Sequence, residues 1–269
     1  MPELPEVETI RSELSPHIIG CRFTEVIICD PKPVRQPSVE EFSLKLTGQE
    51  INSLERRGKY LIFHLSHGMV LIIHLKMTGS LLLNPEQVNR HARVVFHLDN
   101  SSRLVFTDRR RLGALWLLEN EQAIIGKLGP EPLASEFTTE TLAKLLRKRQ
   151  APIKAVLLDQ AFIAGIGNMY ADEALFAARI HPLRKANSLS PQKIRNLHKA
   201  IVDVLQAAVD SKGASIDTYK RPDGQLGTAH ANFSVAHRGG KPCPICGTAI
   251  QRLAIRNRGS YFCPNCQKP

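Results

Sequence analysis

Two pairs of cysteines near the end of the chain constrain its fold more than any other feature. The runs CPIC (243–246) and CPNC (263–266) each have the C-x-x-C spacing, and sixteen residues separate them. This pattern is typical of a zinc site in which two short turns bring four thiolates to one tetrahedron; the alternative is two redox dithiols. Four thiolates leave zinc no open position, which predicts one structural Zn²⁺ held by Cys243, Cys246, Cys263 and Cys266.

Positive charge is concentrated around these cysteines. The chain carries 36 Lys and Arg against 25 Asp and Glu, a net charge of +11. The stretch 238–269 contains six basic residues and no acidic one. Such an excess indicates a polyanionic partner, most commonly nucleic acid. We therefore interpret the element as a zinc hairpin whose arginines read phosphates; the alternative is that they only solubilise a small domain.

The rest of the composition is that of an ordinary globular protein, with 43% hydrophobic and 23% charged residues. No apolar run is long enough to cross a bilayer, and the start lacks the basic and apolar segments of a signal peptide. We expect no membrane partner and a cytoplasmic location. The two remaining cysteines, Cys21 and Cys29, are expected to be buried, reduced thiols.

The spacing of apolar residues divides the chain into a β-rich part and a helical part. Short β-rich runs broken by turn residues dominate 1–130, after a helical pattern that we expect to end at Ser15-Pro16. LGPEPL (128–133) is typical of a linker. Helical spacing follows in 138–149, 168–180 and 190–213, where Ser190 and Gly213 are the expected caps. The segment 214–237 is irregular, and we expect it to be mobile.

The first residues, MPELPEVETI, concentrate proline and glutamate where a domain is usually least ordered. If Met1 is removed, Pro2 carries a free amine with a pKa near ~8, against ~10.4 for lysine. More of it is then unprotonated at neutral pH, so it is the better nucleophile, and Glu3 beside it could move protons. The alternative is a simple helix start, which favours the same residue types.

The combination of motifs resembles one family along essentially the whole chain: bacterial formamidopyrimidine-DNA glycosylase, of the group that includes endonuclease VIII. The resemblance is carried by PELPEVET, RRGKYL, HLKMTGSL, TDRRRLGA, LGPEPL, AGIGNMYADEALFAARIHP and RNRGSYFCPNCQ.

This resemblance implies an α+β multidomain fold. A catalytic β-sandwich with an N-terminal helix would occupy 1–130, and a helical helix–two-turn–helix domain with a mobile lesion-capping loop would occupy 131–237. The zinc hairpin would form 238–269. The implied partner is double-stranded DNA containing oxidised purines or abasic sites, held between the halves with the damaged base everted. We expect a monomer.

The family's roles fall on matching residues. Pro2 would attack the sugar C1′ and form a Schiff base, with Glu3 as the acid and Glu6 at the lesion pocket. Lys59 would donate a proton during β-elimination and Arg258 during δ-elimination. The implied DNA contacts are His74, Met77, His91, Arg110, Leu112, Arg149, Lys154, Asn168 and Arg258.

The chain departs from the family at Leu112, where phenylalanine is common, at Ala229, and at VAHR (235–238) in place of VYGR. The first position belongs to the wedge that fills the gap left by the everted base, and the others lie near the capping loop. Two alternatives stay open: an endonuclease VIII-like glycosylase for oxidised pyrimidines, and a non-catalytic zinc-hairpin protein that binds damaged DNA. The set Pro2, Glu3 and Lys59 favours an enzyme.

Overall fold

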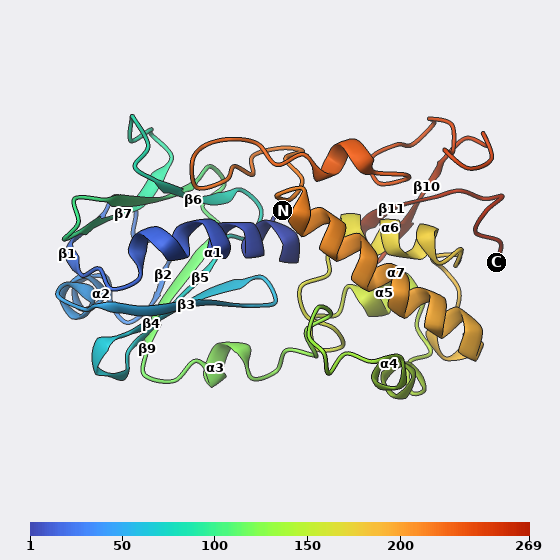
Figure 1. The fold of residues 1–269 in the computed structure, drawn as a ribbon, viewed down its shortest axis with the longest axis horizontal. Coiled ribbons are helices and arrows are strands. Elements are labelled where there is room, and N and C mark those ends of the chain that lie inside the picture. Colours follow the sequence, from blue (N-terminus) through green and yellow to red (C-terminus); the bar gives the residue numbers. More distant parts are fainter. The chain divides into compact units, whose positions relative to one another are not determined.

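A computed structural model describes all residues, 1–269, and the chain packs as two compact units. Unit 1 comprises Met1–Lys127 and Ser211–His230; unit 2 comprises Leu128–Asp210 and Ala231–Pro269. Figure 1 shows the elements of each unit. The functional division into 1–130, 131–237 and 238–269 stays a prediction beside this division by packing.

Unit 1 is built on two β-sheets. The five-stranded sheet has the order β2-β9-β5-β4-β3 and the four-stranded sheet the order β1-β7-β8-β6. All neighbouring strands are antiparallel except the β2–β9 pair. The strands are β1 (Phe23–Ile28), β2 (Val34–Gln36), β3 (Ile51–Arg57), β4 (Tyr60–Leu65), β5 (Val70–His74), β6 (Gly79–Leu83), β7 (Ala92–Leu98), β8 (Arg103–Asp108) and β9 (Ala114–Leu118).

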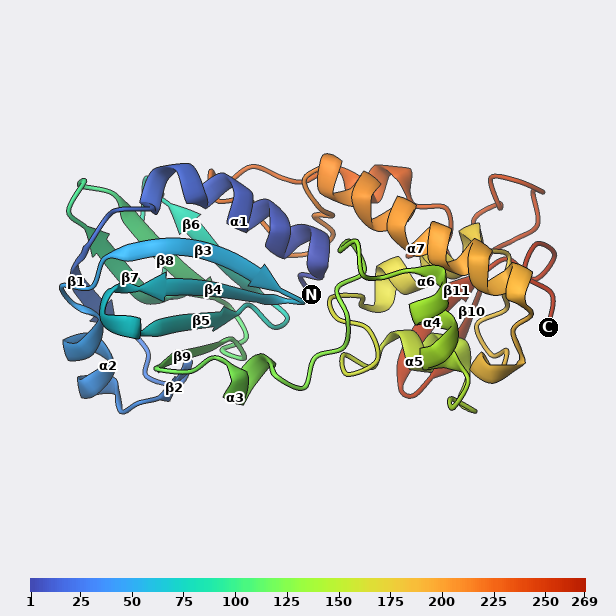
Figure 2. The ribbon, with the colours of Figure 1, turned by 60° about the horizontal axis from the view of Figure 1, so that its bottom comes forward.

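One apolar core joins the two sheets. Alternate residues of each sheet point into it, including Phe63 and Leu71 from one sheet and Val94 and Phe106 from the other. The helices of unit 1 are α1 (Leu4–Ile18), α2 (Val39–Leu46), α3 (Gln122–Ile125) and the 3₁₀ turn η1 (Ser66–Gly68). Figure 2 shows α1 alongside β3, against which it packs. The predicted β-sandwich with an N-terminal helix is confirmed.

Helix α1 does not end where the sequence pattern predicted. Ser15-Pro16 was the expected stop, but α1 continues to Ile18 with Pro16 inside its last turn. Proline there removes the hydrogen bond that its own N–H would donate and crowds the carbonyl four residues earlier. Ile18 is completely buried in the core, and packing of the last turn outweighs that loss.

The segment 211–230 packs on the sandwich. Tyr219 lies in its apolar core, and the Pro222 carbonyl accepts a hydrogen bond from the Leu83 backbone at 2.8 Å. The Arg221 guanidinium lies 2.7 Å from the Glu13 carboxylate of α1. The expected lack of regular structure in 214–237 is confirmed except for the 3₁₀ turn η3 (Ala229–Asn232). Its mobility stays a prediction.

Unit 2 contains four helices, in the three regions where helical spacing predicted them and at one short additional site. They are α4 (Thr139–Leu146), α5 (Ile153–Leu157), α6 (Asn168–Ala177) and α7 (Pro191–Asp210), with the 3₁₀ turn η2 (Ala186–Ser188) before α7. The Ser190 carbonyl accepts the Ile194 N–H at 3.0 Å at the start of α7. Helix α6 is buried along most of its length and packs against α5 and α7.

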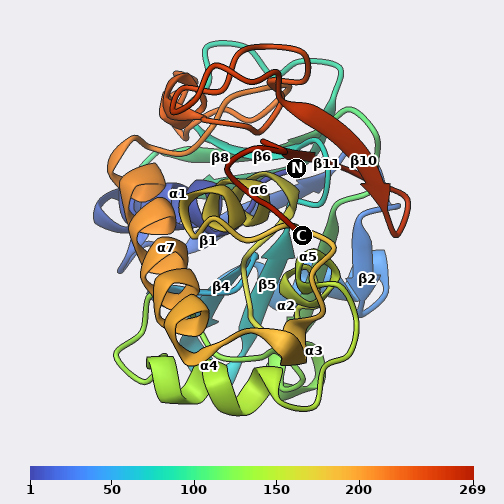
Figure 3. The same cartoon turned by 90° about the vertical axis from the view of Figure 1, so that its right-hand side faces the viewer.

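The chain ends in a two-stranded antiparallel hairpin, β10 (Gln251–Ile255) and β11 (Arg258–Phe262). Its two turn residues, Arg256 and Asn257, have left-handed φ values of 47° and 60°, which suits a tight two-residue connection. Figure 3 shows the hairpin, whose strand β11 packs on α6.

Cys21 and Cys29 are both free thiols, as expected, but the prediction that both are buried is wrong. Cys21 is half-buried, and Cys29 is exposed directly after β1, a strand in which Thr24, Glu25 and Ile27 also face solvent. None of the helices combines the length and apolar character needed to cross a membrane.

Candidate functional site

The start of the chain is unusually well ordered for a terminus. Pro2 is buried, and Glu3, the N-cap of α1, is 2% exposed. The Glu6 carboxylate, itself completely buried, accepts a hydrogen bond from the Glu3 backbone N–H at 2.7 Å. Its other oxygen accepts from the Ala214 N–H at 2.8 Å. One carboxylate thus ties the predicted nucleophile and acid to the segment 211–230.

Gly213 makes this contact possible. Its φ of +75° is in the left-handed region, and a Cβ there would lie 2.9 Å from the Glu6 side chain. Any side chain would therefore push the Ala214 amide away from the Glu6 carboxylate. Gly213, predicted as the cap of the last helix, lies three residues beyond the end of α7 at Asp210, and its role in the structure is to let the backbone come close to the Glu6 carboxylate.

Lys59 lies in the turn between β3 and β4 and is 5% exposed. Figures 1 and 2 place this turn and the first turn of α1 at the same end of unit 1. Lysine is rarely buried to this extent unless it is paired, and buried titratable groups cluster at functional sites, so its burial favours a functional role for Lys59.

His74, at the end of β5, is 7% exposed. Burial, and then the charges of Lys76 and Lys59, lower its pKa from 6.5 to about 3. Its Nδ1 accepts the Lys76 N–H at 2.9 Å, so the proton of the neutral ring lies on Nε2. At neutral pH His74 can donate one hydrogen bond, to a phosphate oxygen for example, but carries no charge.

The remaining residues predicted in unit 1 lie on turns. Met77 follows β5, and Arg110 and Leu112 lie between β8 and β9; all three are exposed. His91, just before β7, is half-buried.

In unit 2, Lys154 of α5 is completely buried. Its Nζ donates to the Asn168 carbonyl at 2.6 Å and to the Asp172 carboxylate at 2.5 Å. Burial raises the pKa of Asp172 to about 6, although Lys154 opposes the shift. This ion pair fixes the turn 165–168 against α5.

The same turn is joined to the hairpin. The Asn168 amide donates to the Gly259 carbonyl at 2.8 Å, next to Arg258 at the start of β11. Arg258 is exposed, as is Arg149, whose guanidinium lies 3.4 Å from Asp159. The structure therefore brings Lys154, Asn168 and the strand bearing Arg258 into one hydrogen-bonded group.

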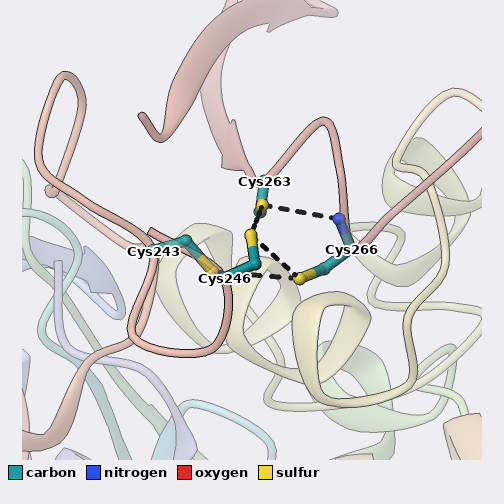
Figure 4. Close-up of side chains that lie close together, drawn as sticks. All are labelled: Cys243, Cys246, Cys263 and Cys266. Atoms are coloured by element: carbon teal, nitrogen blue, oxygen red, sulfur yellow. Dashed lines mark hydrogen bonds between the residues drawn. The ribbon is translucent and has the colours of Figure 1, made fainter. Parts of the chain in front are cut away.

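The four predicted zinc ligands converge. The Sγ atoms of Cys243, Cys246, Cys263 and Cys266 all lie within 4.8 Å of one another, and Figure 4 shows them facing a common centre. Neighbouring sulfurs are 3.5 to 3.9 Å apart. A tetrahedron with Zn–S bonds of about 2.3 Å needs sulfurs roughly 3.8 Å apart. The residues fit one structural zinc.

Four acidic residues with organising roles escaped the sequence reasoning. Asp30 and Asp108 accept hydrogen bonds from the turn that carries Leu112. Asp172 and Glu173 lie inside α6, where Glu173 accepts the N–H groups of residues 234–236 at 2.7 to 2.9 Å. The available signal was an acidic pair, YADEA (170–174), within an otherwise apolar helix.

Known protein families match most of the chain. Residues 1–115 match the formamidopyrimidine-DNA glycosylase N-terminal domain, 128–220 the formamidopyrimidine-DNA glycosylase H2TH domain, and 240–269 the zinc finger found in FPG and IleRS. The formamidopyrimidine-DNA glycosylase of Symbiobacterium thermophilum is 45% identical, over 99% of this chain and 89% of that protein. That of Desulforamulus reducens is 43% identical, over 100% and 99%.

Solved structures of proteins with these names resemble this chain over nearly its whole length. The Lactococcus lactis Fpg, in complex with an abasic site containing DNA, has a TM-score of 0.91 and 35% identity, covering 99% of this chain and 100% of that one. The MutM (FPG) protein from Thermus thermophilus has a TM-score of 0.90 and 39% identity, covering 99% of this chain and 98% of that one.

A β-sandwich, an H2TH helical region and a four-cysteine zinc finger together define a DNA-repair glycosylase of the zinc-finger class. Within that class, the chain belongs to the formamidopyrimidine-DNA glycosylase family. The resemblance noted from the motifs is confirmed.

Proposed function

We propose that the protein is a bifunctional DNA glycosylase and AP lyase that excises oxidised purines, such as 8-oxoguanine and formamidopyrimidines, and then cleaves the strand. The observation that carries this proposal is the buried, hydrogen-bonded start of the chain. Glu6 holds the Glu3 backbone at 2.7 Å, directly beside Pro2. A nucleophile needs such fixed geometry, because misplacement by a fraction of a bond length lowers the rate steeply.

After removal of Met1, the Pro2 amine would attack C1′ of the damaged nucleotide. The N–C1′ bond forms while the glycosidic bond breaks, and its electron pair leaves with the base, which takes up a proton. Glu3 is the acid that we place in this proton transfer, since it is adjacent and buried. The Pro2 nitrogen loses its proton, which leaves a cyclic aminal in which C1′ still carries the ring oxygen. The C1′–O4′ bond then breaks, its electron pair leaves on O4′, which takes up a proton, and the iminium that forms is a Schiff base between Pro2 and the opened sugar.

The iminium makes the C2′ hydrogen acidic, so loss of that proton expels the 3′ phosphate in β-elimination. A second elimination expels the 5′ phosphate, and both leaving groups are stabilised by proton donors. We assign these donations to Lys59 and Arg258. Lysine and arginine also attract phosphates, which suits both to this step.

The proposed partner is double-stranded DNA with an oxidised purine or an abasic site. The net charge of +11 supports a polyanionic partner. Proposed contacts come from both units: His74, Met77, His91, Arg110 and Leu112 in unit 1, and Arg149, Asn168 and Arg258 in unit 2. Lys154, the other predicted contact, is completely buried and paired with Asp172, so we propose that it holds the Asn168 turn and does not touch the DNA itself. The Lactococcus lactis relative, in complex with an abasic site containing DNA, supports the same substrate class.

We also propose that the protein acts as a monomer at the chromosome, in the bacterial cytoplasm. Every proposed catalytic residue is supplied by a single chain, so no second copy is needed to complete the chemistry. The basic surface would keep the protein associated with the nucleoid through non-specific DNA binding.

The decisive experiment is borohydride trapping on duplexes that contain 8-oxoguanine, a formamidopyrimidine, an oxidised pyrimidine or an abasic site. We expect a covalent adduct on Pro2 with the purine lesions and the abasic site, and weak trapping by Pro2→Gly. A preference for oxidised pyrimidines would support the endonuclease VIII-like alternative. Binding without any adduct would support the non-catalytic one. Unchanged trapping by protein with a blocked N-terminus would overturn the mechanism.

A further inference from the structure

A buried carboxylate organises the turn between β8 and β9. Asp108, the last residue of β8, is completely buried. Its Oδ2 accepts the backbone N–H groups of Leu112 and Gly113, each at 2.7 Å. Its Oδ1 accepts the Arg110 N–H at 3.1 Å. A single side chain therefore fixes three backbone amides of a turn that has no regular secondary structure.

The same carboxylate reaches the turn that carries Met77. The Thr78 hydroxyl donates to Asp108 Oδ1 in a short hydrogen bond and accepts the Arg110 N–H at 3.0 Å. The two turns, which lie 30 residues apart in the sequence, are thereby joined. They carry Met77, Arg110 and Leu112, which hold the positions of the three family residues that fill the gap left by the everted base and which we call the wedge. Met77 is 38% and Leu112 37% exposed.

A second carboxylate holds the middle of the β8–β9 turn. Arg111 has a φ of +59°, a left-handed conformation that residues with a Cβ rarely adopt. Its Nε and Nη2 donate to the two oxygens of Asp30 at 2.6 and 2.9 Å. Asp30 is 5% exposed, and its pKa is held below the usual range first of all by this hydrogen bond.

Arg93 connects the two carboxylate sites. Its Nη1 lies 3.5 Å from Asp30, and its Nε donates to the Asp108 carbonyl at 2.8 Å. Close packing also requires Gly113, because a Cβ there would overlap the Phe106 ring and lie 3.2 Å from Asp108 Oδ2. The turn is therefore built to hold one conformation rather than to adapt.

We propose that Asp108 and Asp30 are positioning residues for the wedge: they hold the β8–β9 turn in the shape in which Arg110 and Leu112 enter the DNA stack. This inference rests on the proposed function. A loop that must be ordered on binding loses affinity through conformational entropy, whereas a preformed turn does not. Arg111 then acts through Asp30 and not on the DNA.

The test compares Arg111→Gln, Asp30→Asn and the double variant with wild-type protein. Single-turnover kinetics at varied enzyme concentration are measured on an 8-oxoguanine duplex and on a duplex with a ready-made abasic site. We expect each single variant to need on the order of tenfold more enzyme for half-maximal excision, the equivalent of one charge-assisted hydrogen bond. The double variant should be no worse than Arg111→Gln, because the two residues act as one unit.

Cleavage at the ready-made abasic site should change less, because less eversion and wedge insertion remain to be done. Arg111→Lys keeps the charge but cannot form the two-pronged contact, so it should resemble Arg111→Gln. Arg35→Gln removes the same charge from an exposed position on β2 and serves as the matched control. Because Asp108 variants can fail to fold, Thr78→Val, with its melting temperature measured, tests the Asp108 network by removing one hydroxyl.

Two results would overturn the inference. A defect in Arg111→Gln with wild-type behaviour of Asp30→Asn would mean that Arg111 contacts DNA directly. Wild-type behaviour of all the variants, Thr78→Val included, would mean that the turn need not be preformed. By contrast, wild-type protein that leaves both duplexes intact would contradict the proposed function itself.

Discussion

The sandwich of unit 1 and the hairpin of unit 2 hold their functional side chains by different physical means. In the sandwich, one apolar core spans both sheets and α1, and the proposed catalytic residues lie at the ends of the elements that it fixes. The apolar cluster at the hairpin contains five buried residues, and two of them, Cys243 and Cys263, are zinc ligands. Apolar burial therefore positions the catalytic residues of the sandwich, and metal coordination positions the basic residues of the hairpin.

This difference means that the two sets of residues can be disabled independently. A small hairpin has too little apolar surface to fold without its metal. The sandwich has a core of its own and should tolerate metal loss. The sharpest experiments are those that affect one region and leave the other unchanged.

Zinc removal should produce the largest effect. Structural zinc sites contribute apparent binding free energies of about 10–16 kcal/mol to folding of their domains. Chelation, or Cys246→Ser, should release one equivalent of zinc and abolish measurable DNA binding by fluorescence anisotropy. Trp116 on β9 is the single tryptophan of the chain, so its emission reports the sandwich alone and should not change.

Cys29→Ser is the matched control, because this exposed thiol lies far from the zinc ligands in sequence. It should keep zinc and DNA binding at wild-type values. If the metal-free protein bound DNA as tightly as the loaded protein, the hairpin would not be a phosphate reader and the comparison would fail.

Glu3→Gln should have the second largest effect and should be confined to unit 1. Removing a general acid typically lowers a rate about 10²–10⁴-fold. Base excision should fall by that order in single-turnover assays, while zinc content and DNA affinity stay at wild-type values. Glu40→Gln, an exposed carboxylate on α2, controls for the loss of charge. Wild-type excision by Glu3→Gln would remove Glu3 from the mechanism.

Acid should destabilise the sandwich through His74. The folded protein keeps this imidazole neutral with a pKa of about 3, whereas the unfolded chain protonates it near 6.5. The unfolded state therefore binds more protons, and stability is lost as the pH falls from 6.5 towards 3. At pH 5 the loss from this group should be about 2 kcal/mol relative to neutral pH.

Urea unfolding followed by Trp116 emission, at pH 7 and pH 5, measures this loss. His74→Gln cannot titrate, so the variant should show a pH dependence smaller by about the same 2 kcal/mol. Equal pH dependence of the two proteins would mean that His74 is not held neutral by the fold.

How much of the fold and of the candidate site could be predicted depends on how far apart in the sequence the interacting residues lie. The zinc ligands and the helices α4, α6 and α7 follow from local spacing, and the structure confirms them, whereas the short helix α5 was not predicted. The role of Asp108 could not be predicted, because it depends on Thr78, 30 residues away. Pro16 misled for the same reason: the burial of Ile18 in a distant core overrides a local stop signal.

The smallest predicted effect concerns Leu112, where the chain departs from the phenylalanine common in the family. Leucine can act as an apolar wedge, but it fills less area than an aromatic ring and has no π-face to stack on a base. Base–aromatic stacking contributes on the order of 1–3 kcal/mol in single-strand binders. Leu112→Phe should therefore bind lesion duplexes more tightly, by no more than roughly 1 kcal/mol, the low end of that range.

Leu112→Ala should move the other way, weakening both binding and excision, because the gap in the stack is left unfilled. Cleavage of a ready-made abasic site should suffer less, since the base is already absent. The hydrogen bond from the Leu112 N–H to Asp108 Oδ2 uses only the backbone of Leu112, so both variants keep the turn that the carboxylate organises. Any change in affinity can then be attributed to the side chain. Equal affinities of the leucine, alanine and phenylalanine proteins would show that position 112 does not touch the DNA stack.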